Sequence, residues 1–383
     1  MTGTNAAGSV RSGQPPSPWR LFYVCAVTVL SLVVLAWFLW RPGIEGYGYA
    51  TVPDLVYGRA WKPYVYRVLL PGTVRLLAAA LPDQTRARVS AWLAEQPALG
   101  IRALMSGWDQ AHLLEYLIAV VLMYLCLCGF LWSLRELLTA LYRVAERVRD
   151  VFTLVVLAGL PLFFRYHNYP YDFPTLFLFT LGLSLLLRQS WRWFFPVYVL
   201  ACLNKETTIL LTLVFALHFR REQRMSREQF SNLLTAQVVI FVVVKLGLAA
   251  VFRDNPGSFV ALQGTRHNLD LLGALSLPAV FGWCGVALLL FYRWSEKPLF
   301  LRRALWIVVP LVGLTFFLGY LDELRDYYEA YPVVALLLLH SVSRLWGLRI
   351  TVVGSPQTPR PVQAGERPGP GGDAPDGCPS AGP

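Results

Sequence analysis

The fold of this chain is decided by the stretch FFPVYVLACLNKETTILLTLVFALHF, residues 194–219. Both ends of the stretch are apolar, and five consecutive polar residues, Asn204 to Thr208, interrupt its middle. An ionisable side chain at the centre of a membrane costs about 2.5 to 3.5 kcal/mol on insertion scales, so a Lys beside a Glu needs a compensating reason. The interruption therefore indicates a functional site, with a Lys205–Glu206 ion pair at a helix break as the alternative.

The composition indicates a membrane protein. Of the 383 residues, 56% are hydrophobic and only 15% are charged, which is far more apolar than a soluble domain requires. The first long apolar run, residues 21–40, matches one helical crossing of a hydrocarbon core about 30 Å thick. We therefore expect an all-α, polytopic bundle of transmembrane helices in the cytoplasmic (inner) membrane.

Basic residues form short clusters between the apolar runs, which is the pattern of the positive-inside rule rather than of nucleic-acid binding. Arginines flank residues 194–219 on both sides, so a single crossing would put one group on the wrong side of the membrane. A hairpin of two short helices keeps both groups in the cytoplasm. We therefore predict that the chain reverses at Asn204–Thr208.

About ten membrane segments are expected, counting the hairpin as two, with both termini in the cytoplasm. Residues 20–346 would form the transmembrane domain, and residues 1–19 and the Pro/Gly-rich tail 347–383 would be disordered. Residues 41–110 would form an outer loop with interfacial amphipathic helices, one of them within residues 64–81. The remaining crossings are expected at residues 21–40, 113–134, 151–164, 173–187, 230–252, 271–292, 304–320 and 332–345.

This topology brings most of the unusual polar clusters to the outer face. They lie at residues 45–67, 165–172, 204–206, 266–267 and 322–329. Together they supply Lys and Arg as counter-charges, tyrosines as amphipathic walls and carboxylates as proton acceptors, which are the groups that a lipid-phosphate site needs. Solvated turns are the alternative for the loop clusters.

Other chemistry lacks a signature. The sequence has no HExxH motif and no Cys/His cluster at ligand spacing, so no metal site is expected. It has no GxxxxGK[ST], GxGxxG or GxSxG motif, so no nucleotide cofactor and no α/β-hydrolase nucleophile are expected either. The six cysteines are scattered and indicate no disulfide framework.

The layout and four short segments resemble the GT-C superfamily of polytopic glycosyltransferases, which use sugars linked to polyprenyl phosphate. The segments are residues 62–71, the pair Tyr171-Asp172, residues 204–207 and residues 323–332, within a similarity that covers residues 20–346. The resemblance implies transfer of a sugar from a polyprenyl-phosphate donor to a cell-envelope acceptor at the outer face, among membrane lipids and without a cofactor.

By this resemblance Asp54 would be the general base, and Lys205 or Arg325 would hold the departing polyprenyl phosphate. Many such enzymes carry a tighter acidic pair in the first loop, whereas Glu45 and Asp54 are nine residues apart here. Glu45 and Asp172 are therefore alternative bases. The other residues expected to bind substrate are Tyr66, Arg67, Asp172, Asn204, Glu206 and Glu323.

Two other functions remain open. A transporter or flippase for a lipid or an anionic solute would also use a broken helix within the membrane, although the two halves of the chain show no internal repeat. A non-enzymatic scaffold would not need charges within apolar spans. The sequence leaves open the sugar, the acceptor and the oligomeric state.

Overall fold

Helices follow one another along the chain. The computed structural model describes residues 17–95, 107–220, 225–258 and 264–353, and within these ranges the only strands are two residues long. The predicted all-α class is confirmed. The α-helices are α1 (Pro18–Trp40), α2 (Val52–Val56), α3 (Leu69–Ala79), α4 (Asp83–Glu95), α6 (Leu113–Leu141), α7 (Glu146–Gly159), α8 (Asp172–Leu187), α9 (Trp191–Asn204), α10 (Ile209–Phe219), α11 (Arg227–Val251), α12 (Gly264–Gly273), α13 (Leu277–Phe291), α14 (Leu299–Ala304), α15 (Val308–Leu318) and α16 (Tyr331–Leu345).

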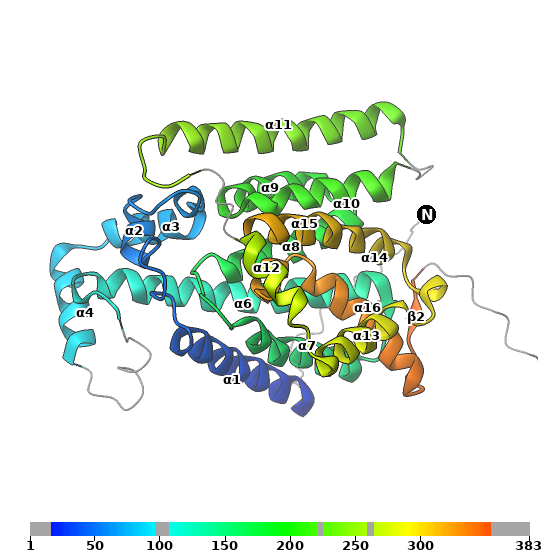
Figure 1. Ribbon diagram of the computed structural model, residues 1–383. Coiled ribbons are helices and arrows are strands. Elements are labelled where there is room, and N and C mark those ends of the chain that lie inside the picture. The colour runs from blue at the N-terminus through cyan, green and yellow to red at the C-terminus, as the bar shows by residue number, and fades with distance from the viewer. Residues whose placement is uncertain (1–16, 96–106, 221–224, 259–263, 354–383) are drawn as a thin grey trace, which may run out of the picture. The chain divides into compact units, whose positions relative to one another are not determined.

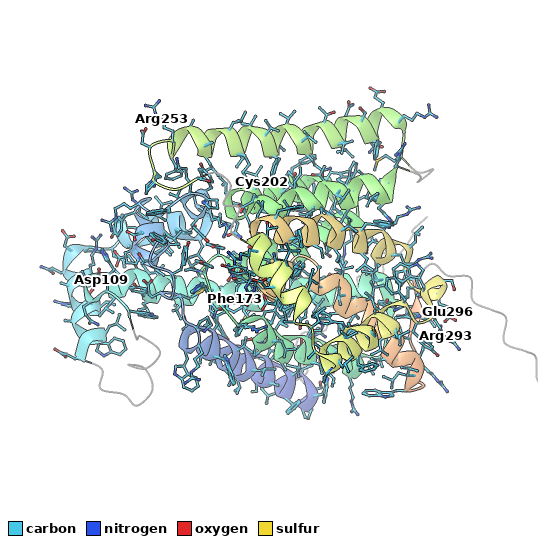
Figure 2. All side chains as sticks on the ribbon, in the orientation of Figure 1. Asp109, Phe173, Cys202, Arg253, Arg293 and Glu296 are labelled. Carbon is cyan, nitrogen blue, oxygen red and sulfur yellow. The ribbon has the colours of Figure 1, made fainter. Side chains whose placement is uncertain are left out.

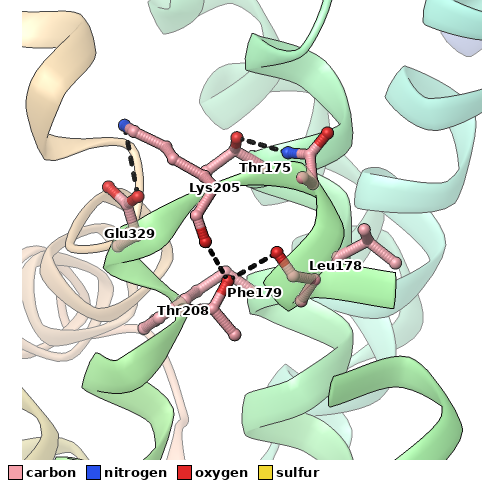
Figure 3. A pocket seen from close by; sticks show the side chains of 8 residues that line it. Thr175, Leu178, Phe179, Lys205, Thr208 and Glu329 are labelled. Atoms are coloured by element: carbon pink, nitrogen blue, oxygen red, sulfur yellow. Dashed lines mark hydrogen bonds and ion pairs between the residues drawn. The ribbon is translucent and has the colours of Figure 1, made fainter. Parts of the chain in front are cut away.

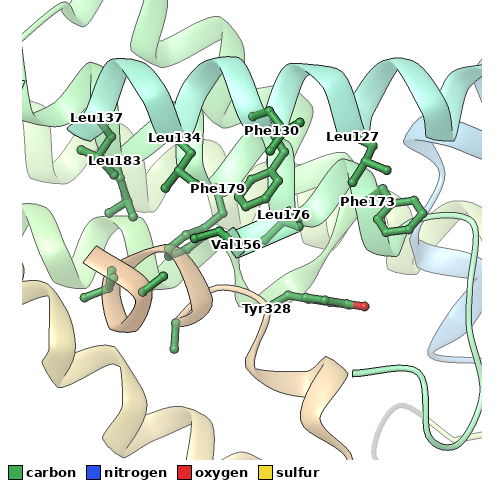
Figure 4. Close-up of a cluster of buried hydrophobic side chains, with 14 of the residues drawn as sticks. Leu127, Phe130, Leu134, Leu137, Val156, Phe173, Leu176, Phe179, Leu183 and Tyr328 are labelled. Carbon is green, nitrogen blue, oxygen red and sulfur yellow. The ribbon is translucent and has the colours of Figure 1, made fainter. Parts of the chain in front are cut away.

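The centre of the bundle is the packing of α6 against α8 (Figure 4). Fully buried side chains recur on α6 every three or four residues, which places them on one helical face. Between membrane helices this contact depends on close packing rather than on removal of water. Gly182 of α8 shows how close the packing is, because a Cβ there would lie 2.6 Å from the Leu211 side chain of α10. The facing residues in Figure 4 include Leu127, Phe130, Leu134 and Leu137 of α6 and Phe173, Leu176, Phe179 and Leu183 of α8.

Several helices have the length and composition of membrane spans. Within the described residues four qualify: α1, residues Gln110–Leu141, α11 and residues Leu299–Leu318. A fifth would be α12 together with α13. The chain is therefore a helical membrane protein, while the full set of ten segments and their orientation stay predictions. The helix within the crossing predicted at residues 271–292 begins later than expected, at Leu277, because the chain bends by 99° between α12 and α13.

The predicted hairpin at Asn204–Thr208 is confirmed by contacts between its two arms. The hydroxyls of Tyr198 in α9 and Thr212 in α10 lie 2.8 Å apart, and the rings of Trp191 and Phe219 are 5.8 Å apart. In one continuous helix, residues 14 positions apart would be separated by about 21 Å. The two helices therefore lie side by side, beneath α11 in Figure 1.

The segment between α1 and α6 gathers at one end of the bundle, where α2, α3 and α4 lie (Figure 1). Figure 2 shows Asp109 at this end and Arg293 and Glu296 at the opposite end. The helix predicted within residues 64–81 is α3, which begins at Leu69 after a 3-10 turn at Tyr64–Tyr66. Its buried residues Leu70, Val74 and Ala78 are four apart and form one face, as an amphipathic helix requires.

Two short backbone pairings join distant parts of the chain. Strand β1 (Tyr142–Arg143) pairs antiparallel with β2 (Thr351–Val352), and Lys62 forms a bridge with Gly257. Residues 347–353 were predicted to belong to a disordered tail, but they include β2 and belong to the folded unit. Most of the two segments predicted as disordered, residues 1–16 and 354–383, lies outside the described residues.

Candidate functional site

Seven charged residues from four separate segments meet near the tip of the α9–α10 hairpin. We call them the charge cluster. One member precedes α3, one begins α8, two form the hairpin tip and three lie between α15 and α16. The members are Arg67, Asp172, Lys205, Glu206, Glu323, Arg325 and Glu329.

Lys205 and Glu329 form a buried ion pair (Figure 3). Lys205 Nζ lies 3.3 Å from Glu329 Oε1, and the two side chains are 7% and 0% exposed. The backbone of Lys205 is extended, with φ −153° and ψ 147°, and this interruption of the helix separates its side chain from that of Glu206. Thr207 donates a further hydrogen bond to Glu329. The alternative in which Lys205 and Glu206 neutralise each other is therefore wrong, because each has a partner elsewhere.

Glu206 pairs with Arg67 across a long sequence distance. Arg67 Nη2 lies 2.7 Å from Glu206 Oε1, and its other terminal nitrogen donates to the Tyr171 hydroxyl. The guanidinium also lies over the Tyr171 ring, 4.5 Å from its centroid. The Arg67 side chain is 10% exposed, whereas that of Glu206 is 41% exposed. Glu206 is thus the accessible partner of a buried cation.

Arg325 is held by two carboxylates and a ring. Its Nε donates to Glu323 Oε1 at 2.6 Å, its Nη1 lies 3.8 Å from Asp172 Oδ1, and its guanidinium lies 4.4 Å from the Tyr169 ring centroid. Asp172 in turn accepts the backbone N–H of Tyr169 at 3.0 Å. The rings of Tyr169 and Tyr171 stack at 5.1 Å, so tyrosines separate Arg325 from Arg67.

Asn204 and Lys245 tie the hairpin to its neighbours. The Asn204 amide donates to the Tyr171 carbonyl at 3.1 Å and to Thr175 Oγ1 at 2.8 Å, while its oxygen has no partner among the described residues. Lys245 of α11 donates to the Cys202 carbonyl at 2.7 Å. This bond links α11 to the last turn of α9.

Asp54 has a local role. It lies in the first turn of α2, where the Thr51 hydroxyl accepts its backbone N–H at 3.2 Å and donates to its carboxylate at 2.7 Å. Such a reciprocal arrangement caps a helix N-terminus. Its carboxylate also lies 3.4 Å from Arg59 Nε. None of its contacts within the described residues joins Asp54 to the charge cluster.

The remaining residues of the first loop have different surroundings. Glu45 accepts the Val52 backbone N–H at 2.7 Å, and burial raises the pKa of Glu45 to about 7. That value suits a general base at neutral pH, but no described contact connects Glu45 with the charge cluster. Tyr66 is buried in a small apolar cluster that also contains Tyr169 and Tyr171. Tyr66 therefore belongs to the same buried cluster as the stacked rings of Tyr169 and Tyr171.

A small cavity lies beside the Lys205–Glu329 pair (Figure 3). Its volume is about 10 Å³, which is the space of roughly one water molecule. A sugar does not fit there unless the surrounding side chains move. Within the described residues, no three His, Cys, Asp or Glu side chains gather in a way that would hold a metal ion. The cavity is lined by Thr175, Leu178, Phe179, Ala201, Asn204, Lys205, Thr208 and Glu329.

The charge cluster contains three cations and four carboxylates, so it carries no excess positive charge. Sequence reasoning had not selected Glu329, because residues 322–329 hold four acids and nothing in the sequence marks the partner of Lys205. The chain matches no family model, no curated protein and no solved structure. Its function therefore has to be inferred from the geometry of the site.

Proposed function

We propose that this protein is a membrane glycosyltransferase that moves a sugar from a polyprenyl-phosphate donor to an acceptor hydroxyl at the outer face of the membrane. The observation that carries the proposal is the pairing of buried Arg67 with half-exposed Glu206 at the hairpin tip. A donor phosphate and a carboxylate compete for the same guanidinium, since both are bidentate acceptors.

The proposed reaction begins when the donor phosphate replaces Glu206 as the partner of Arg67. When the donor phosphate binds Arg67, Glu206 is released and becomes free to accept a proton. The acceptor oxygen attacks the anomeric carbon and passes its proton to Glu206, while the bond from that carbon to the phosphate oxygen breaks. The phosphate leaves with the electron pair and is stabilised by Arg67, as general-base and electrostatic catalysis require.

Glu206 is a better candidate for the base than the other carboxylates of the charge cluster. Asp172 is 1% exposed, Glu323 is 7% exposed and Glu329 is fully buried, so an incoming hydroxyl does not reach them. Asp54, the base expected from the resemblance, is engaged by Thr51 and Arg59. Accessibility and contact with a phosphate-binding cation therefore both favour Glu206.

Lys205 and Arg325 would act from further inside. Their carboxylate partners hold both side chains in place, so the two cations are fixed groups rather than mobile ligands. The ring of Tyr64 lies 5.4 Å from that of Tyr169, and Tyr169 stacks on Tyr171. These rings offer amphipathic walls for the sugar and the first prenyl unit of the donor.

Sugar transfer by the full chain in liposomes tests the proposal. Radiolabelled hexoses and pentoses linked to polyprenyl phosphate serve as donors, and labelled product in a cell-envelope extract is measured. Glu206→Gln and Arg67→Gln are expected to abolish transfer, whereas Glu146→Gln, a half-exposed acid in the first turn of α7, is expected to leave it unchanged. Wild-type turnover by Glu206→Gln would remove the base assignment.

A transporter is the second candidate, and the buried Lys205–Glu329 pair at a helix break favours it. Charged groups at interrupted membrane helices are common in transporter binding sites. The cavity of about 10 Å³ also requires the helices to move before any solute enters. Exchange of a polyprenyl-phosphate lipid across the liposome membrane, without a covalent product, would support transport and exclude transfer.

A further inference from the structure

A second and much larger cavity lies away from the charge cluster, between α4 and the start of α6. Its volume is about 370 Å³, at the lower end of the range for small-molecule sites. Three elements form it: the end of α2, one face of α4, and the turn that leads into α6. It is lined by Tyr57, Asp83, Arg86, Ala87, Ser90, Ala111, His112 and Glu115.

The buried polar group of this groove is Glu115. Its residue is 4% exposed, and its Oε1 accepts the Tyr57 hydroxyl at 2.7 Å. His112 Nδ1 lies 3.9 Å from the same oxygen, too far for a direct hydrogen bond. That nitrogen and Nε of Arg86 are buried without a hydrogen-bond partner within the part of the chain that the structure describes. Both atoms are covered by the protein, so the polar groups open to a ligand are others of the lining, which come from Asp83, Arg86, Ser90 and Glu115.

The lining selects a class of ligand. Its only hydrocarbon side chains are those of Ala87 and Ala111, so an acyl chain has no apolar wall to bind. The two carboxylates of Asp83 and Glu115 oppose Arg86 and His112, so the groove does not attract an anion such as phosphate. A ligand with adjacent hydroxyls can donate to a carboxylate and accept from a guanidinium at the same time. The Tyr57 ring offers a face for its C–H groups.

We propose that this groove binds a neutral, hydroxyl-rich group, namely a sugar residue. The Asp83 and Glu115 carboxylates accept from hydroxyls of the ligand, and Arg86 donates to another hydroxyl while its Nη2 holds the Ala78 carbonyl at 2.8 Å. The inference does not depend on the sugar-transfer reaction, because a transporter or a receptor can also carry a saccharide site. A free sugar and the headgroup of a glycolipid share this chemistry, and the test separates the two sources.

Binding to the full-length protein tests the proposal. The protein is purified in a polyoxyethylene detergent, because detergents with sugar headgroups would occupy the groove. Saturation-transfer NMR is recorded with methyl glucoside, methyl mannoside, methyl arabinoside and myo-inositol, and with choline and inorganic phosphate as charged probes. A second series uses nanodiscs with and without a glycosyl diacylglycerol.

Arg86→Gln removes a charged donor, and loss of such a hydrogen bond is expected to weaken saccharide binding about tenfold or more. Ser90→Trp fills the groove from α4 without removing a charge, so it tests the site even if Arg86→Gln fails to fold. The matched control is Arg88→Gln, an exposed residue of the same helix.

The expected result is saccharide binding that Arg86→Gln weakens about tenfold or more, that Ser90→Trp abolishes and that Arg88→Gln retains. Binding only in glycolipid nanodiscs would identify a lipid-linked sugar as the source. The proposal is overturned if no saccharide binds the wild-type protein in either series, if choline or phosphate binds in its place, or if Ser90→Trp retains wild-type affinity. Each outcome is independent of whether Glu206→Gln abolishes sugar transfer.

Discussion

Two breaks interrupt apolar helices in this protein, and they differ in almost every respect. The break at Asn204–Thr208 is held by Arg67, Tyr171 and Glu329, which belong to three other segments. The break between α12 and α13 is exposed, and its N-cap is the local hydrogen bond from the Ala279 N–H to Ser276 Oγ at 3.4 Å. Both redirect the chain, but only the first concentrates charge.

The difference shows that a turn within apolar sequence does not require ionisable residues. Leu-Ser-Leu-Pro at residues 275–278 makes a bend of 99° with a single cap. The hairpin tip instead buries a Lys and the carboxylate that neutralises it, which costs desolvation energy that a simple turn would avoid. The presence of ionisable residues at the hairpin tip is therefore better explained by function than by folding.

The largest expected effect is that of Glu329→Ala. It leaves the Lys205 ammonium buried without its counter-charge, and breaking a buried pair in this way costs about 3 to 5 kcal/mol. Unfolding in mixed micelles, followed by tryptophan fluorescence, measures the loss. The double variant Lys205→Met/Glu329→Leu removes both charges and should recover most of the stability. Equal losses in the single and double variants would contradict the assignment.

Asn204→Leu should have the next largest effect on stability. It removes the donor of two buried hydrogen bonds, to the Tyr171 carbonyl and to Thr175 Oγ1, and each such bond contributes about 0.5 to 1.5 kcal/mol. The control is Gln237→Leu in α11, because the Gln237 amide donates only to Leu233 of its own helix. A larger loss from the control, in the same micelle assay, would show that Asn204 does not hold the hairpin to α8.

A double-mutant cycle on Tyr198→Phe and Thr212→Val tests the contact between the two arms of the hairpin. The two hydroxyls lie 2.8 Å apart, so a coupling of about 0.5 to 1.5 kcal/mol is expected. The cycle compares the unfolding free energies of the two single variants and the double variant. Additive losses would mean that the arms of the hairpin do not touch there.

The smallest expected effect belongs to the second break. Ser276→Ala removes an exposed N-cap, and such a change costs about 0.5 kcal/mol. It should leave sugar transfer unchanged, as measured in the liposome assay. If Ser276→Ala destabilised the protein more than Asn204→Leu, the contrast between the two breaks would be lost.

The hairpin was predictable from the sequence because arginines on both flanks of residues 194–219 require both ends on one side. The partners of the tip were not predictable. Arg67 and Glu206 are 139 residues apart, and Thr207 and Glu329 are 122 apart, and no periodicity of the sequence records such contacts. The sequence therefore indicates the hairpin tip, but the pairings of its charged residues required the structure.

Two features of the structure have local signals in the sequence. Thr51 and Asp54 have the spacing of a capping box, which predicts a helix N-terminus at the position assigned to a catalytic base. Ser276 followed by Pro278 is a typical helix start, and it marks the break within the span predicted at residues 271–292. In both cases the apolar runs indicate where the segment lies, and the capping residues within it indicate where the helix begins.

The pairing of β1 with β2 constrains the number of membrane crossings in the chain between them. An open two-stranded pair does not occur in hydrocarbon, so Tyr142–Arg143 and Thr351–Val352 lie outside the bilayer on the same side. The chain between them must cross an even number of times. The candidate spans between them are α11, Leu299–Leu318 and the α12–α13 pair, so if all three cross, an odd number of the shorter helices must cross as well. Labels placed at Arg143 and Thr351 must therefore report the same compartment.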